Sequence, residues 1–167
     1  HFLYRKAIFA FSERFLQAGE AAEAAKALHA LHFLAGAGSG ELLDKFGIFI
    51  CDLQVSQLIL FKEQSKPGRV IVAYKDHVDD INLLSDNDRN AFMEDVVRVT
   101  RAMQKVFNPD KINYGAYADT LEHLHFHLIP KYVGGPGFGG VFQMNPEKVY
   151  LTDEEYADMA EALKNAL

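Results

Sequence analysis

The sequence contains a single cysteine, Cys51, among its 167 residues. One thiol cannot form an intrachain disulfide, and it cannot build a cysteine-based zinc site without several other ligands. We therefore expect a protein of a reducing compartment, which predicts a cytoplasmic location. Cys51 itself is expected to act as a small hydrophobic side chain within a sheet.

Long hydrophobic runs and an excess of positive charge are also missing. Charged residues such as Arg5, Glu13 and Lys26 interrupt the apolar N-terminal region, so no stretch approaches the roughly 20 residues that cross a bilayer. The N-terminus shows no secretory signal pattern either. The formal net charge of −6 argues against a surface devoted to nucleic acid. We expect neither a membrane nor a nucleic acid as partner, whereas a phosphorylated small molecule remains compatible with this charge.

The chain divides into two parts at a glycine-rich stretch. Residues 1–45 consist mostly of good helix formers and end in Gly36, Gly38 and Gly40, which predicts a helical N-terminal extension. The remaining part, 46–167, has the length of one domain with its own core.

Within 46–167, hydrophobic patterns and capping residues predict the individual elements. Strands are expected near 48–55, 58–61, 70–74, 111–117 and 123–131. Ser85 is the expected N-cap of a long helix that ends before Pro109. Thr152 and Glu155 have capping-box spacing and predict the start of a last helix.

The segment 123–128 alternates histidine with hydrophobic residues. Because side chains alternate across a strand, His123, His125 and His127 are expected on one face and the intervening hydrophobic residues on the other. A lone histidine is more often structural, but three in alternation indicate chemistry. Two interpretations stay open at this point. The three imidazoles converge on a metal ion, or one of them is a nucleophile that attacks phosphorus while a neighbour transfers a proton.

The same residues resemble a known family. Three histidines separated by single hydrophobic residues, followed by Leu128, Ile129, Pro130 and Lys131, and the upstream run 68–77 (GRVIVAYKDH) are similar to the histidine triad (HIT) superfamily. The resemblance covers about residues 46–132 and extends to bacterial diadenosine polyphosphate hydrolase-like members.

That resemblance implies a role for each histidine of the triad. His125 would attack the α-phosphate and form a nucleotidyl-histidine, His127 would assist the leaving group, and His123 would support the nucleophile. It also implies that no metal and no other cofactor is needed.

Three further positions would face the substrate by the same resemblance. Thr120 would bond a phosphate oxygen, unless it is only a turn residue. His77 would support the site, unless it caps a loop or faces solvent. Glu63 would contact sugar hydroxyls, with a solvated charge pair as the alternative.

Three other positions depart from the better-known relatives. Arg69 stands where many relatives have a histidine, and it would either pair with a phosphate or remain an exposed charge. The short loop before the triad has Tyr117 where relatives have an amide side chain, and Asn113 is the amide that precedes it. Asp119 replaces a glutamine there, which puts phosphate contacts on this side in question.

Together these observations predict an α+β protein with a HIT-like fold, in which an antiparallel sheet carries one long helix and a C-terminal helix after the N-terminal helical extension. The expected function is a nucleotide hydrolase or transferase, acting on dinucleoside polyphosphates or nucleoside phosphoramidates as a homodimer. The alternatives are a metal-dependent histidine site and a nucleotide-binding module with little catalysis.

Overall fold

The computed structural model describes residues 45–117, 123–141 and 147–167. The predicted helical extension therefore lies outside the described residues, except for Lys45. Thr120 and Asp119 lie outside them as well. None of the described helices combines the length and the hydrophobicity that spanning a bilayer requires.

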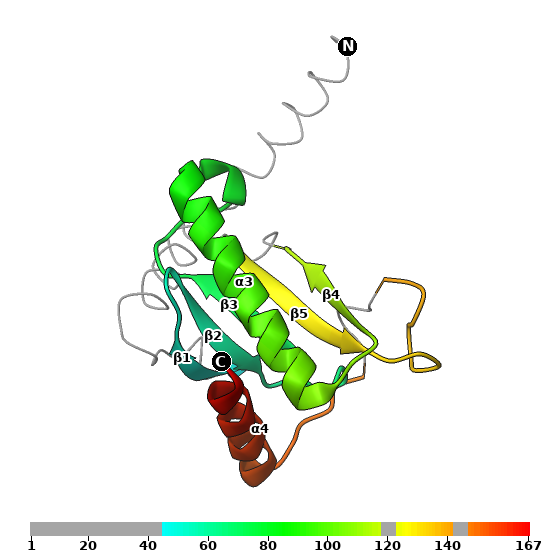
Figure 1. Cartoon of the computed structure of the whole chain (residues 1–167). Helices are drawn as coiled ribbons and strands as arrows, with labels where there is room; N and C mark the ends of the chain where they lie inside the picture. Colours follow the sequence, from blue (N-terminus) through cyan, green and yellow to red (C-terminus); the bar gives the residue numbers. More distant parts are fainter. Residues whose placement is uncertain (1–44, 118–122, 142–146) are drawn as a thin grey trace, which may run out of the picture.

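In the described residues, five antiparallel strands form one sheet in the order β1-β2-β3-β5-β4. Their bounds are β1 Gly47–Asp52, β2 Ser56–Phe61, β3 Val70–Tyr74, β4 Lys111–Gly115 and β5 His125–Lys131. Figure 1 shows α3 lying across one face of this sheet, with α4 beside it. The predicted α+β class and antiparallel sheet are confirmed.

Tertiary hydrogen bonds explain where the first strand ends. The sequence pattern extends it to Val55, but β1 ends at Asp52. Asp95, from the long helix, accepts hydrogen bonds from the backbone N–H groups of Gln54 and Val55 at 3.1 and 2.9 Å. These bonds hold the segment between β1 and β2 as a turn, which local sequence pattern cannot reveal.

Both predicted helix starts are confirmed by their caps. Helix α3 covers Asp86–Phe107, and its N-cap Ser85 accepts from the Asp88 backbone N–H. It ends at Asn108 in the left-handed conformation, directly before Pro109. Helix α4 covers Asp153–Ala166 and begins with the predicted capping box of Thr152 and Glu155. A short 3-10 turn, η1 Ile81–Leu83, precedes α3.

The main core lies between the sheet and the two helices. Its buried members from the helices are Phe92, Val96, Val99, Met103, Tyr156 and Leu163. They pack against Leu58, Leu60, Val70, Val72 and Leu128 of the strands. On the opposite face, the described residues form a small apolar cluster around Ile59 and Ala73. We call these the helix face and the histidine face.

Candidate active site

Strand β5 places His125 and His127 on the histidine face. His125 pairs with Ala73 and His127 with Ile71 of β3, while Gly115 of β4 lies opposite His127 on the other side. The two rings are T-shaped, with centroids 5.0 Å apart. Both histidines are buried, at 7% and 5% exposure. Ala73 has a small side chain and Gly115 has none, which leaves room for two imidazoles side by side.

The hydrogen bonding of His125 assigns its protons. Its Nδ1 lies 2.7 Å from the backbone oxygen of His123. A carbonyl oxygen only accepts, so Nδ1 carries the proton and Nε2 keeps its lone pair. Burial lowers the pKa of His125, and the charge of Arg69 lowers it further, against the hydrogen bond to His123. His125 is therefore a neutral imidazole whose Nε2 is a ready nucleophile.

His127 has the opposite proton arrangement. Its Nδ1 lies 3.3 Å from Nη2 of Arg69, and a guanidinium only donates hydrogen bonds. Nδ1 of His127 is therefore the acceptor, and the proton sits on Nε2. Burial, followed by the charges of Arg69 and His125, lowers the pKa of His127 far below its ordinary value. The two neighbouring rings thus offer a lone pair from His125 and an N–H donor from His127.

His123 serves the backbone at the end of β3. Its Nε2 donates to the Tyr74 carbonyl at 2.8 Å, and its ring stacks on His77 with centroids 6.0 Å apart. Burial lowers the pKa of His123 to about 4. Within the described ranges, no group of three or more metal-ligating side chains is close enough to hold a metal.

His77 lies at the rim of this arrangement. It is partly exposed, and its Nε2 lies 3.7 Å from a carboxylate oxygen of Asp79. Among the described residues of the site, it contacts the stacked ring of His123, and a supporting role for His77 stays a prediction.

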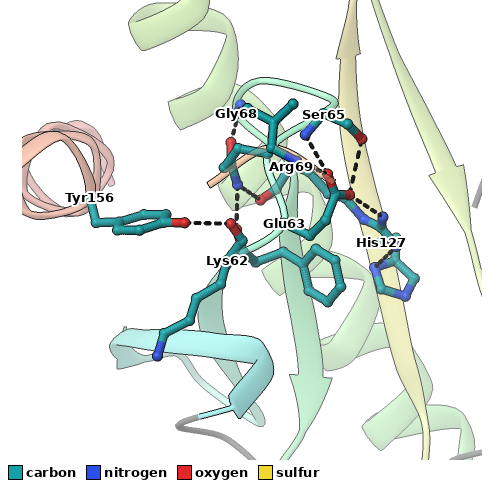
Figure 2. A network of polar contacts seen from close by, with 10 residues as sticks. Lys62, Glu63, Ser65, Gly68, Arg69, His127 and Tyr156 are labelled. Carbon is teal, nitrogen blue, oxygen red and sulfur yellow. Dashed lines mark hydrogen bonds and ion pairs between the residues drawn. The ribbon is translucent and has the colours of Figure 1, made fainter. Parts of the chain in front are cut away.

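Arg69 is the most deeply buried charge of the histidine face, at 2% exposure. Its guanidinium lies over the Phe61 ring at 4.1 Å and reaches Glu63 through Nη1 at 3.8 Å, as Figure 2 shows for the ion pair. The alternative of an exposed charge at Arg69 is therefore wrong. Burial lowers the pKa of Arg69, although the guanidinium remains charged.

Glu63 is held by the protein itself. Its carboxylate accepts from the Ser65 backbone N–H at 2.7 Å, the Ser65 hydroxyl at 3.0 Å and the Val149 backbone N–H at 3.2 Å. Burial alone raises the pKa of Glu63, but these hydrogen bonds and Arg69 bring it below its ordinary value. The expected contact of Glu63 with sugar hydroxyls stays a prediction, and its present partners anchor Arg69.

The turn between β2 and β3 depends on a glycine. Gly68 has a φ of +81°, and a Cβ on it would lie 2.9 Å from side-chain atoms of Phe107 and Pro130. No other residue fits there without displacing these neighbours. Gly68 thereby lets the chain enter β3 with Arg69 directed onto the histidine face.

Tyr117 and Asn113 lie on the β4 side of the histidines. The Tyr117 ring is 6.5 Å from that of His127 and is 42% exposed. Both residues line a cavity of about 310 Å³ between β4 and the glycine-rich segment 134–140, which we call the glycine loop; Gly140 and Val141 form the other wall. Their contacts with a substrate remain predictions, and Thr120 lies outside the described residues.

Two contacts of this region were not predicted from the sequence, those of Phe61 and of Lys131, although Lys131 belongs to the segment that resembles the HIT superfamily. Phe61 supports both Arg69 and His127, whose ring meets it edge-on at 5.7 Å. Lys131 donates through Nζ to the backbone oxygens of Gly137 and Gly140 at 2.6 and 2.5 Å, which ties the glycine loop to the triad strand. Lys131 follows His127 at even spacing, so strand alternation was the available signal.

The comparisons with known proteins agree with this geometry. The family model described as HIT domain matches residues 49–134. "Protein hit" of Bacillus subtilis is 28% identical over 89 residues, which cover 50% of this chain and 61% of that protein. The match thus spans less than two thirds of that relative's length.

Solved structures show the same fold. A histidine triad protein from Sinorhizobium meliloti has a TM-score of 0.71 at 22% identity, covering 80% of this chain and 99% of that one. One from Marinobacter aquaeolei has a TM-score of 0.69 at 22% identity, covering 79% and 97%.

Proposed function

This chain belongs to the HIT domain family, and on that premise we propose that it is a nucleotide hydrolase or transferase. It breaks a phosphoanhydride or phosphoramidate bond at the α-phosphate of its substrate. The observation that carries the proposal is the opposite proton arrangement of two adjacent imidazoles, the Nε2 lone pair of His125 and the Nε2–H of His127. A nucleophile beside a fixed donor is what attack on phosphorus requires.

The proposed reaction has two steps. In the first, Nε2 of His125 attacks the α-phosphorus, the P–N bond forms, and the bond to the leaving group breaks with its electron pair staying on that group. The leaving group of a phosphoanhydride departs as a phosphate anion, whereas the leaving nitrogen of a phosphoramidate also takes up a proton from solvent. In the second, a water or another acceptor attacks the same phosphorus, and the P–N bond to His125 breaks. Water yields the nucleoside monophosphate, and the proton released from water goes to solvent.

The surrounding residues prepare the two rings. The backbone oxygen of His123 holds the proton of His125 on Nδ1, which keeps Nε2 available. The Nε2–H of His127 donates to an oxygen of the reacting phosphate or to the leaving atom. Arg69 adds positive charge next to the site, which attracts an anionic substrate.

The deciding experiment compares wild type with His125→Ala. Purified protein is incubated with diadenosine tetraphosphate and with adenosine 5′-phosphoramidate, and released AMP is measured by chromatography. Wild type should release AMP from at least one of them, and His125→Ala should not. Asn82→Ala, at an exposed position of η1, is the control that should behave like wild type. Equal AMP release by wild type and His125→Ala would overturn the assignment, and no release by wild type would favour a binding module.

We also propose the finer points of assembly and organisation. The chain would form a homodimer in the cytoplasm, with 1–45 as a helical extension and 46–167 as the catalytic domain. In the described sheet β4 is an edge strand, and Tyr114 and Val141 beside it are exposed at 49% and 90%. A twofold axis there would cover both. Light scattering of wild type and Tyr114→Arg would test it, since the variant should be monomeric.

A further inference from the structure

We propose that Arg69 restricts this site to leaving groups that depart as stable anions, because its guanidinium fixes His127 as a neutral hydrogen-bond donor rather than an acid. The inference rests on the proposed function and narrows its substrate class to phosphoanhydrides as against phosphoramidates. Arg69 is thus a specificity-determining residue that acts through His127.

In the hydrogen bond between Arg69 and His127, the donor must be Arg69 and the acceptor must be His127. Nη2 of Arg69 lies 3.3 Å from Nδ1 of His127, and both residues are buried. Because a guanidinium has no acceptor, Nδ1 of His127 must keep a lone pair toward it. The single ring proton is then on Nε2, which faces away from Arg69.

Glu63, His127 and Phe61 are the described side chains that hold the guanidinium in this position. Figure 2 shows Arg69 between Glu63 and His127, with its ion pair to one and its hydrogen bond to the other. Phe61 supports its flat face at 4.1 Å. Glu63 in turn is fixed by Ser65 and by the Val149 backbone N–H. Arg69 therefore cannot swing away without breaking several contacts.

A second proton on the His127 ring, which would make it a cation, is unfavourable in this environment. A proton on Nδ1 would point at the Nη2–H of Arg69, so the hydrogen bond would be lost and two cations would lie 3.3 Å apart. In the part of the chain that the structure describes, the other rings that contact His127 are those of His125, with centroids 5.0 Å apart, Phe61 and Tyr117. None of these three is a carboxylate that could offset the added charge. Burial lowers the pKa of His127 in the same direction.

The consequence depends on the leaving group. When a phosphoanhydride breaks, the leaving phosphate is already a stable anion and needs only a hydrogen bond. When a phosphoramidate breaks, the nitrogen must receive a proton as the P–N bond breaks, since an amide anion is too basic to leave. A neutral imidazole cannot supply that proton without becoming an anion itself, whereas an imidazolium can.

Kinetics on two substrates test the preference. Wild type should show a kcat/KM for diadenosine tetraphosphate at least about 10²-fold above that for adenosine 5′-phosphoramidate, the scale of a missing general acid. Arg69→Met removes charge and donor but keeps an apolar contact with Phe61, and it should lower this ratio at least tenfold. Arg69→Lys keeps the charge and a donor, and should retain the ratio. Arg89→Met removes an exposed arginine on α3 and is the matched control.

Nitrogen-15 NMR of the histidine rings provides a readout independent of turnover. In wild type, His127 should show an unprotonated Nδ1 and a protonated Nε2 between pH 5 and 8, and Arg69→Met should abolish this fixed tautomer. Because the tautomer is measured on wild type, this test does not depend on whether a variant folds.

The outcomes separate the two proposals. Similar kcat/KM values of wild type for both substrates, an unchanged ratio in Arg69→Met, or a proton on Nδ1 of wild-type His127 would each overturn the role of Arg69 and leave the proposed function standing. Turnover of neither substrate would overturn the proposed function, and the preference with it.

Discussion

The two faces of the sheet differ in how the protein satisfies the hydrogen-bonding groups of buried polar side chains. On the helix face, Asp95 is 2% exposed, and its carboxylate accepts from two backbone N–H groups and from the Ser56 hydroxyl at 2.7 Å. All these hydrogen-bond donors belong to the protein itself, so the carboxylate of Asp95 has a structural role. On the histidine face, the protein binds one nitrogen of His125 and one of His127 and leaves each Nε2 toward the site.

This difference teaches where stability and chemistry are located. Strand β5 contributes to both faces, because Leu128 packs into the main core while His127 stands on the opposite side. Alternation along one strand thus separates the two tasks within single-residue steps. A change on the helix face should affect unfolding, and a change on the histidine face should affect turnover.

The largest expected effect is at the nucleophile. His125→Asn should reduce turnover of the preferred substrate by about 10⁴-fold or more, equivalent to about 5.5 kcal/mol of transition-state stabilisation. Its free energy of unfolding should change by at most about 1.5 kcal/mol, the scale of one hydrogen bond. Steady-state kinetics and urea unfolding measure the two quantities. A large loss of stability with retained turnover would reverse the comparison between the faces.

Removing the buried carboxylate of the helix face should have the converse effect. Asp95→Ala leaves the Ser56 hydroxyl and the backbone N–H groups of Gln54 and Val55 without their acceptor, so the free energy of unfolding should fall by about 3 kcal/mol. Glu94→Ala, its exposed neighbour, should change it by less than about 0.5 kcal/mol. kcat at a temperature where Asp95→Ala is folded should stay near wild type, and a strong drop would argue against the separation.

Acid should destabilise the protein through the histidine face. His123 has a folded pKa of about 4, below its ordinary 6.5, so between these values the unfolded chain binds a proton that the native state does not. The contribution of neutral His123 to the free energy of unfolding is therefore fully present above pH 7 and is lost as the pH drops from 6.5 toward 4. His123 alone should cost about 2 kcal/mol between pH 7 and 5.

Urea unfolding at pH 7, 6 and 5 measures this dependence. His123→Asn should flatten the curve relative to wild type, whereas Glu94→Ala, at an exposed position of α3, should reproduce its slope. If the free energy of unfolding of wild type stayed constant down to pH 5, the buried histidines would not make the protein sensitive to acid, and this difference between the faces would be wrong.

The smallest effect is expected at the start of α4. Thr152→Ala removes the side chain that accepts from the Glu155 backbone N–H, which should lower the free energy of unfolding by about 1 kcal/mol. Glu154→Ala in the same turn leaves the cap intact and is the control. kcat/KM of Thr152→Ala should equal that of wild type at 25 °C, since the cap lies in the helix layer.

The sequence was sufficient wherever the signal is local. Ser85 and Thr152 are N-caps as predicted, because a cap depends on residues three positions apart. The placement of His125 and His127 on one face follows from alternation alone. The helical and strand patterns together were enough to predict the α+β class.

Features built by distant residues could not be predicted. The end of β1 depends on Asp95, about 40 positions away. The burial of Arg69 depends on Phe61, on His127 and on a carboxylate fixed from Val149. Sequence resemblance marked Arg69 as a departure, but only the packed structure places its guanidinium against a ring nitrogen.

The C-terminal segment is bonded to the turn that carries Glu63 and Arg69. The Tyr156 hydroxyl donates to the Lys62 carbonyl at 2.6 Å, and the Gln64 backbone N–H donates to the Val149 carbonyl at 2.8 Å (Figure 2 shows the first). Segments bonded in this way open together in local unfolding, and amide exchange reports such units. Fraying of α4 therefore loosens the support of Arg69, so hydrogen-exchange protection of the last helix and of the β2–β3 turn should rise and fall together.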